Sequence, residues 1–376
     1  GSFMDGLTTI TTTATDKLQA VGAADDPNVP FSTMFTGLLL VNLYYWGTDQ
    51  AIIQRALGAK NLKEGQKGVI LAGAIKVITP LFLIIPGIIA YHMFGSADAA
   101  GVSFEADTMY TRLVGEVLPK PLVGFFVAAM FGAILSTFNG VLNSSTTLFT
   151  LNVYKPIFDK EGKLSDQELV HKGRMFGVFI AVLSVAIAPF IMYAPNGLFD
   201  LLQRLAGLFS VPIFTIVFMG YLTKRVPAIA AKVSLAFFVV AYGIIQFTPT
   251  QFHDSLGPLK PLAELHFFHQ LAVLFAICCG IMLLIGKLRP RETEYVMPIN
   301  ESIDITPWAF RFEASGIILY MVLGAYIVFS DLGLVTGDKG LMVIYGIVGL
   351  VLLTGLYFRV KTKKKNLLKM EELPTK

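Results

Sequence analysis

Four side chains early in the chain have the types and spacing of a binding surface. Asn42, Tyr45, Trp46 and Asp49 stand at positions i, i+3, i+4 and i+7 of an apolar run. On a helix these four residues share one face. Gly47 lies among them and weakens a helix by about 1 kcal/mol relative to alanine. A polar and aromatic face with a weak point, inside a membrane-like segment, predicts part of a binding site.

A single lysine lies deep in the next apolar run. Lys76 is the ninth residue of a stretch that starts at Gly68, which places it about 13 Å along a helix and near the centre of a bilayer. No acidic residue in the same stretch can pair with it. Such a lysine either snorkels to the interface or sheds its proton, or it faces a polar cavity and donates to hydroxyl oxygens. The second reading makes Lys76 a substrate-binding residue.

Two polar residues lie near the start of a later apolar run, at residues 198–222. Gln203 offers an amide that both donates and accepts, which suits a polyol, although an interhelical hydrogen bond would use it equally well. Arg204 is more suited to a gate or an ion pair than to direct ligand binding. Gly207 and Pro212 follow in the same run, so we expect a bent or discontinuous helix there.

Small and hydroxylated residues form one stripe at three- and four-residue spacing within residues 121–153. The stripe consists of Ala133, Ser136, Thr137, Gly140 and Ser144. Such a stripe is typical of close helix packing in membranes. A hard cation is also bound by neutral hydroxyl and carbonyl oxygens, which avoid a buried net charge. Packing and cation binding both remain open from the pattern alone.

The composition places all these residues in a membrane. The chain has 376 residues, of which 54% are hydrophobic and only 15% are charged. A soluble domain this apolar would have too little polar surface, so we predict an all-α polytopic membrane protein. The formal charge of +4 is no evidence for nucleic-acid binding. The sequence contains no Walker A motif, no GxSxG and no His/Cys metal spacing, so an enzyme has little support.

Nine apolar stretches are long enough to span the hydrocarbon core. They lie near residues 32–56, 68–94, 121–153, 171–194, 198–222, 229–248, 267–287, 312–331 and 339–359. Lysine and arginine follow the first, third, fifth, seventh and ninth stretches, whereas the alternate loops are acidic or nearly uncharged. This alternation is the positive-inside pattern. It predicts a multi-pass protein of the plasma (inner) membrane, with the amino end external and the carboxyl end cytoplasmic.

The motifs, taken in order, resemble one family. The stretch NLYYWGTDQAIIQRALGAKN resembles the sixth core helix of sodium/sugar cotransporters of the solute:sodium symporter family. The resemblance continues through Lys76, LNSSTTLFTLNVYKP, HKGRMFG and LFDLLQRL, and it covers the chain to about Leu288. The combination is highly specific for the family, and the YYW…QR segment favours its glucose/galactose branch.

The resemblance implies a leucine-transporter-type core of two inverted five-helix repeats with peripheral helices. It implies that sugar is bound by Asn42, Tyr45, Trp46, Lys76 and Gln203. Tyr45 also looks like an inner gate, together with Asp49, Arg55 and Arg204. The family's sodium site matches Ala133 through its carbonyl and Ser136 and Thr137 through their hydroxyls. Sodium is then the coupling ion, and no other cofactor is expected.

The family's first broken helix and its neighbours have no counterpart in the sequence. We therefore expect an amino-terminally truncated transporter with a loop remnant at 1–31 and the second repeat at 32–222. Peripheral helices at 223–359 and a cytoplasmic tail at 360–376 would follow. The predicted function of the complete protein is sodium-coupled sugar symport by alternating access. The alternatives are a sodium symporter for inositol, an amino acid or a sialic acid, and a non-transporting membrane sensor or assembly partner.

Overall fold

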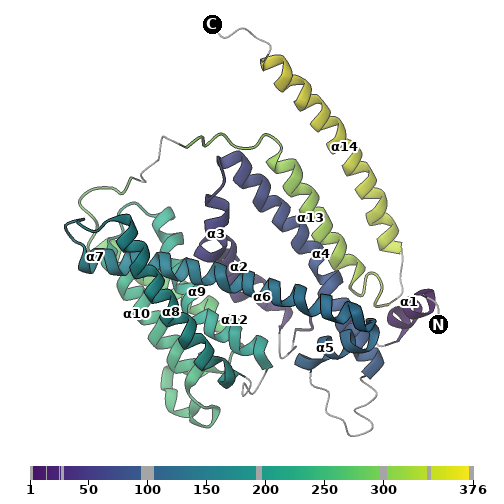
Figure 1. Ribbon diagram of the computed structural model, residues 1–376, viewed down its shortest axis with the longest axis horizontal. Helices are drawn as coiled ribbons and strands as arrows, with labels where there is room; N and C mark the ends of the chain where they lie inside the picture. Colours follow the sequence, from purple (N-terminus) through teal and green to yellow (C-terminus); the bar gives the residue numbers. More distant parts are fainter. Residues whose placement is uncertain are drawn as a thin grey trace. The chain divides into compact units, whose positions relative to one another are not determined.

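The chain is built from helices (Figure 1). The computed structural model describes residues 3–13, 15–24, 26, 29–94, 106–191, 197–296, 303–336 and 340–371, and these residues include no strand. Eight of the described helices are long and apolar enough to cross a membrane. They are α4 (Leu62–Phe94), α6 (Lys120–Phe149), α8 (Asp166–Ile191), α9 (Gly197–Leu222), α10 (Ala228–Phe247), α12 (Phe267–Leu288), α13 (Arg311–Val328) and α14 (Gly340–Glu371). They match eight of the nine predicted spans, so the chain is an all-α polytopic membrane protein.

The first predicted span, at 32–56, is not one continuous helix. It is divided into the 3-10 turn η2 (Phe31–Phe35), α2 (Gly37–Gly47) and α3 (Gln50–Leu57). The helix ends where the weak position Gly47 is followed by Thr48, whose backbone is non-helical at φ −138°. The carboxylate of Asp49 then accepts the Ala51 amide at 2.8 Å, which caps α3. The predicted weak point at Gly47 is therefore where the helix ends, and the apolar stretch at 32–56 stays a predicted span that contains two short helices.

Residues 198–222 were expected to form a bent or discontinuous helix, and the discontinuity is absent. Helix α9 runs through Pro212 without interruption. Gly207 serves close packing instead, because a Cβ there would lie 2.9 Å from the hydroxyl oxygen of Tyr242. Helix α9 packs against α2, α10 and α12. These neighbours hold the helix together where proline removes one backbone hydrogen bond.

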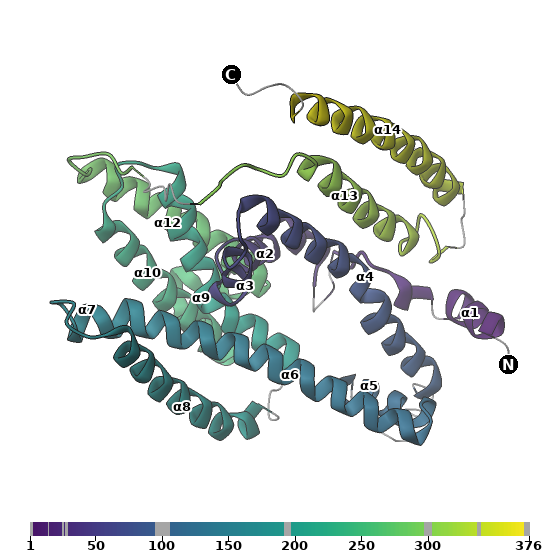
Figure 2. The ribbon, with the colours of Figure 1, turned by 45° about the horizontal axis from the view of Figure 1, so that its top comes forward.

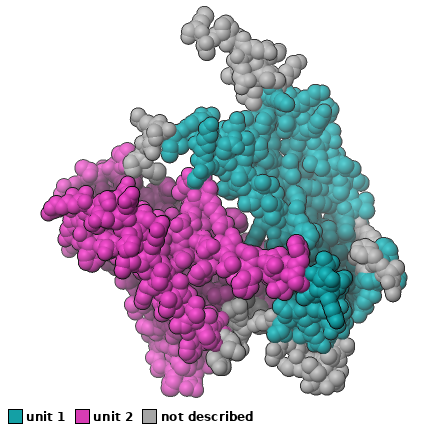
Figure 3. Space-filling view, viewed as in Figure 1, with its two compact units in different colours: residues 1–23, 58–123, 300–376 teal, residues 24–57, 124–299 magenta. Residues whose placement is uncertain are grey.

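The helices form two compact units, which are coloured separately in Figure 3. The unit of residues 24–57 and 124–299 contains η2, α2, α3, most of α6, α8, α9, α10 and α12. Its core lies between α9, α10 and α12, where Phe238, Tyr242, Phe268, Leu271 and Cys278 are buried. The start of α2 lies directly on α12, since a side chain at position 37 would collide with the backbone of Phe268.

Short helical pieces connect the long helices of this unit. The chain leaves α6 through the π-helical turn η4 (Thr150–Tyr154) and α7 (Lys155–Phe158). The 3-10 segment η5 (Thr250–Leu259) and α11 (Lys260–Ala263) join α10 to α12. The Lys260 ammonium lies 2.6 Å from the Asp254 carboxylate in this connection, and that contact holds the pKa of Asp254 below its usual range.

The other unit contains residues 1–23, 58–123 and 300–376. Its helices are α1 (Phe3–Thr12), α4, α5 (Ala106–Val117), α13 and α14, joined at the start by the 3-10 turn η1 (Thr15–Leu18). Helix α13 packs against both α4 and α14, and α13 and α14 lie side by side in Figure 2. The buried Glu313 of α13 is 3.0 Å from the Lys363 ammonium and 3.4 Å from Arg359 of α14. These pairs neutralise a carboxylate that burial would otherwise destabilise.

Several predicted connections are described only in part. Residues 95–105 of the acidic connection after α4 lie outside the described residues, and so do residues 192–196 and 337–339. The basic segment after residue 359 continues as the end of α14 to Glu371. The division into a repeat, peripheral helices and a tail remains a prediction.

Glycines on α8 allow it to approach α6 closely. A Cβ at Gly173 would lie 2.8 Å from Thr150 Oγ1, and one at Gly177 would lie 2.9 Å from Thr146 Cγ2. Gly173 and Gly177 are four residues apart and therefore lie on one helix face. Without side chains at these two positions, α8 has room for the Thr150 and Thr146 side chains.

We expect Gly177→Leu to destabilise the protein. The larger side chain must push α8 away from Thr146, and overpacking of this kind costs about 1–3 kcal/mol. The apparent melting temperature of the detergent-solubilised protein should fall by several degrees. Gly280→Leu is the control, because Gly280 of α12 is exposed and has no atom within 4 Å of its Cβ position. Equal melting temperatures for both variants would refute the close α6–α8 contact.

Candidate functional site

Three residues of the predicted binding face lie together on α2. The Asn42 amide donates to the Leu38 carbonyl at 2.9 Å, which directs the side chain along its own helix. The rings of Tyr45 and Trp46 meet edge to face with centroids 5.4 Å apart. These rings are 41% and 39% exposed, so the face is open to a ligand within this chain.

Asp49 does not continue that face. The sequence placed it two turns beyond Asn42 on one helix, but α2 ends at Gly47. Asp49 instead lies in the break, where its carboxylate binds the Ala51 amide. A gating role for Asp49 remains a prediction, whereas its contact with α3 is structural.

The predicted sodium ligands lie on an exposed face of α6. The Thr137 hydroxyl donates to the Ala133 carbonyl at 3.0 Å, which brings these two oxygens together. Ser136 belongs to the same exposed segment of the helix. A hydroxyl that donates its proton to its own helix keeps lone pairs for an outside ligand. The Ser136 and Thr137 hydroxyls are suitable as part of a shell for a hard cation, with the remaining ligands supplied by other elements. The Ala133 carbonyl accepts both the helical amide and the Thr137 hydroxyl, so it binds a cation only after that hydroxyl turns away.

Lys76 lies in the other unit, near the middle of α4. Its side chain is exposed, and the described residues show no ion pair for it. Each unit is described by itself, so Lys76 and the residues on α2 and α9 are described separately.

Gln203 is half-buried on α9, next to a chain of polar contacts. Arg204 donates to the Gln246 side-chain oxygen at 2.8 Å, and its guanidinium lies 4.8 Å from the Phe267 ring centroid. The Gln246 amide donates to Gln270, which in turn donates to the Leu265 carbonyl at 2.8 Å. Arg204 thus holds α9 to α10 and α12, with an amide as its described side-chain partner.

The sequence patterns did not predict the roles of Gln246 and Gln270 in this series of hydrogen bonds. They also did not predict the junction of α3 with α6. Gln246 and Gln270 are polar residues near the ends of apolar runs, a signal that was available. Gln54 of α3 donates to the Gly140 carbonyl of α6 at 3.1 Å and receives Asn143 at 3.4 Å. Nothing in the local sequence reveals a partner 86 residues away.

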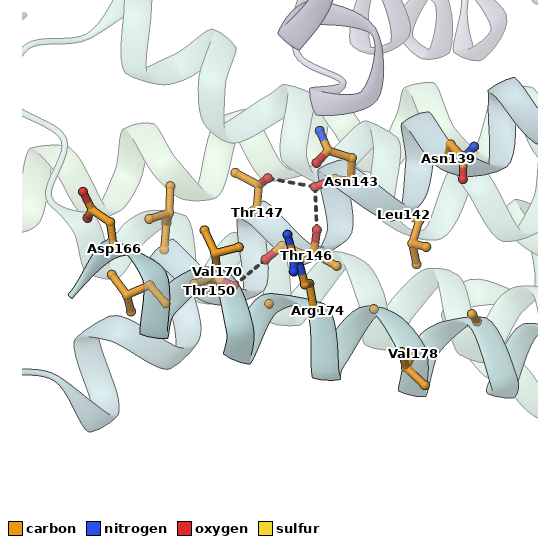
Figure 4. Close-up of a pocket in the computed structure, with 15 residues that line it drawn as sticks. Asn139, Leu142, Asn143, Thr146, Thr147, Thr150, Asp166, Val170, Arg174 and Val178 are labelled. Carbon is orange, nitrogen blue, oxygen red and sulfur yellow. Dashed lines mark hydrogen bonds between the residues drawn. The ribbon is translucent and has the colours of Figure 1, made fainter. Parts of the chain in front are cut away.

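A groove lies elsewhere, between α6 and α8. It has a volume of about 870 Å³, and its polar lining comprises Asn139, Asn143, Thr146, Thr147, Thr150, Asp166 and Arg174 (Figure 4). The hydroxyls of Thr146 and Thr147 donate to the Asn143 carbonyl, and that of Thr150 donates to the Thr146 carbonyl. None of the predicted sugar or sodium residues lines it. Among the described residues, Asn42, Tyr45, Trp46, Ser136 and Thr137 lie on exposed parts of α2 and α6.

The chain is similar in sequence to known sodium-coupled symporters. Residues 1–236 match the sodium:solute symporter family. The chain is 40% identical over 333 residues to an uncharacterized symporter, YidK, of Escherichia coli, covering 89% of the chain and 55% of the relative. It is 32% identical to a sodium/glucose cotransporter of Vibrio parahaemolyticus, covering 79% of the chain and 54% of the relative. Identity to sodium/glucose cotransporter 1 of Ovis aries is 28%, over 69% of the chain and 41% of the relative. The chain thus spans about half the length of these relatives, or less.

We expect Gln246→Leu to loosen the packing of α9. The substitution removes the oxygen that accepts from Arg204, and a hydrogen bond to a charged group contributes about 1.5–3 kcal/mol. Thermal unfolding in detergent should report this loss as a lower melting temperature. Gln251→Leu, at an exposed position of η5, is the control. If the two variants melt alike, the polar chain does not stabilise the helices.

Proposed function

The chain belongs to the sodium:solute symporter family, and on this premise we propose that the complete protein couples the entry of a sugar to that of sodium. The observation that carries the proposal is the open face of α2, where an amide and two aromatic rings lie together. Such rings offer flat apolar surfaces to the C–H side of a pyranose, and amides bind its hydroxyls. The names of two relatives, sodium/glucose cotransporters, support the same substrate class.

In this proposal, Asn42, Tyr45 and Trp46 contact the sugar from α2, and Gln203 contacts it from α9. Lys76 of α4 donates to a hydroxyl. Tyr45 also closes the inner side of the site. The remaining gate residues are Asp49, Arg55 and Arg204.

Sodium binds to the carbonyl of Ala133 and the hydroxyls of Ser136 and Thr137. Neutral oxygens bind the cation without requiring a buried carboxylate in the empty site. When sodium is bound, its positive charge is the main charge at the site. A partner segment that corresponds to the rest of the relatives' length completes both sites. The protein lies in the plasma membrane with its amino end external and its carboxyl end cytoplasmic, as the basic loops favour.

Transport then follows from differential affinity. Sodium stabilises the outward-open state, and that state binds sugar more tightly, so each ligand raises the affinity for the other by the same factor. A membrane potential adds about 2.3 kcal/mol per charge per 100 mV, which is enough to concentrate a neutral sugar. Neither ligand undergoes a chemical reaction, so no catalytic residue is required.

The decisive experiment is uptake of radiolabelled D-glucose and D-galactose by vesicles that contain the complete protein. We expect accumulation that requires an inward sodium gradient and disappears when potassium replaces sodium. Unlabelled inositol, amino acids and sialic acid serve as competitors. Competition by one of these without uptake of either sugar would transfer the function to that solute. Sugar binding without accumulation would indicate a sensor.

Lys76→Ala should weaken sugar binding while sodium dependence is kept. Loss of a charged hydrogen-bond donor costs about 1.5–3 kcal/mol, or roughly a ten- to hundredfold rise in the sugar concentration for half-maximal uptake. Initial uptake rates at saturating sodium measure the change. An unaltered half-saturation concentration would mean that Lys76 lies away from the sugar.

Thr137→Ala should raise the sodium concentration needed for half-maximal uptake by about three- to tenfold, because one neutral oxygen contributes on the order of 1 kcal/mol. Sodium titrations at saturating sugar provide the measurement. Thr137→Ser keeps the hydroxyl and is the matched control. If alanine and serine behave alike, the Thr137 hydroxyl is involved in packing alone.

A further inference from the structure

Gln54 joins α3 to the backbone of α6. Its side-chain amide donates to the Gly140 carbonyl at 3.1 Å, and its side-chain oxygen receives the Asn143 amide at 3.4 Å. A carbonyl inside a helix keeps a second lone pair after it has accepted the helical amide. Gln54 uses this lone pair, so its bond adds to α6 without disturbing the helix.

The missing side chain at Gly140 allows a second contact. The Arg55 guanidinium lies so close that a Cβ at Gly140 would be 2.8 Å from Arg55 Nη2. The end of α3 therefore presents both an amide and a positive charge to one turn of α6. Gly140 lies three residues, or about one turn, beyond Thr137.

Helix α3 lies between the junction with α6 and the predicted binding face on α2. The break at Thr48 and Asp49 separates α3 from α2, and α2 carries the aromatic binding face. Non-helical residues at the end of an element are where a chain absorbs changes in backbone angle during domain motion. If α2 tilts against α3, the hydrogen bond from Gln54 to α6 is strained or relaxed. The distance between the Arg55 guanidinium and the predicted sodium ligands changes with it.

We propose that the junction of Gln54 with Gly140 and Asn143 transmits the effect of sodium on α6 to the sugar-binding helix α2, and thus sets the strength of coupling. This inference rests on the proposed function. The described side-chain hydrogen bonds between α3 and α6 both involve Gln54. Coupling between two sites requires contacts that differ between two states, and in this proposal the two hydrogen bonds of Gln54 are those contacts.

The test measures a coupling factor in vesicles that contain the complete protein. This factor is the equilibrium dissociation constant of radiolabelled D-galactose or D-glucose at low sodium, divided by its value at saturating sodium. Gln54→Met keeps the shape of the side chain and removes its hydrogen bonds. We expect the coupling factor to fall about fivefold, and the reciprocal factor, measured for sodium at low and saturating sugar, to fall equally.

Gln66→Met is the matched control, because Gln66 also makes one described bond to a distant backbone group, the Trp308 amide at 2.7 Å. Its coupling factor should match that of the parent protein. Asn143→Leu is the second variant, since it removes the amide that donates to the Gln54 side-chain oxygen. It should also lower the coupling factor, and it decides the question if Gln54→Met does not reach the membrane.

Each outcome has a separate meaning. If the parent protein shows no sodium-dependent uptake of either sugar, the proposed function fails and the coupling role fails with it. If the parent transports and the variants keep its coupling factor, only the coupling role is overturned. A lower maximal rate with an unchanged coupling factor would assign the junction to folding and would likewise overturn the proposal.

Discussion

A helix that stops inside an apolar span must satisfy the backbone groups that the break exposes, because hydrocarbon offers them no partner. Between α2 and α3 the chain solves this locally. The amides of Thr48 and Asp49 both donate to the Tyr44 carbonyl, at 2.8 and 3.0 Å, and the Asp49 carboxylate accepts the Ala51 amide. This break ends α2 and begins α3 as a separate helix. The aromatic face then belongs to α2 and the contact with α6 belongs to α3, and both proposed roles depend on that separation.

The spans could be predicted because they depend on composition and length. Eight predicted stretches coincide with helices, since an apolar run of about 20 residues has few other stable forms in a membrane. The breaks were harder to predict. Gly47 and Pro212 are both helix-weakening residues, yet the helix stops after the first and continues through the second. Near Gly47 an aspartate can cap a new helix, whereas around Pro212 three packed neighbours support the existing one. Tertiary contacts therefore determine whether the helix ends at such a residue, and local helix propensity does not.

In the candidate site, too, some positions could be predicted from helical spacing and others depended on tertiary contacts. Asn42, Tyr45 and Trp46 share a face because helical spacing alone places them there. Asp49 fails that rule because its helix has already ended. Gln54 and Gln246 could not be assigned from spacing, since their partners lie 86 and 24 residues away in sequence. A polar residue in an apolar span signals that a partner exists. It does not identify the partner, and only the fold distinguishes an interhelical contact from a ligand contact.

If Asn42, Tyr45, Trp46, Ser136 and Thr137 bind ligands as proposed, transport requires their exposure on α2 and α6. A sugar and a sodium ion must both leave the site, so their ligands cannot be saturated by the surrounding helices. Thr137 meets this condition because its proton is directed to the Ala133 carbonyl while its lone pairs remain outward. Arg204 shows the opposite arrangement, with its guanidinium bound to Gln246 and stacked on Phe267.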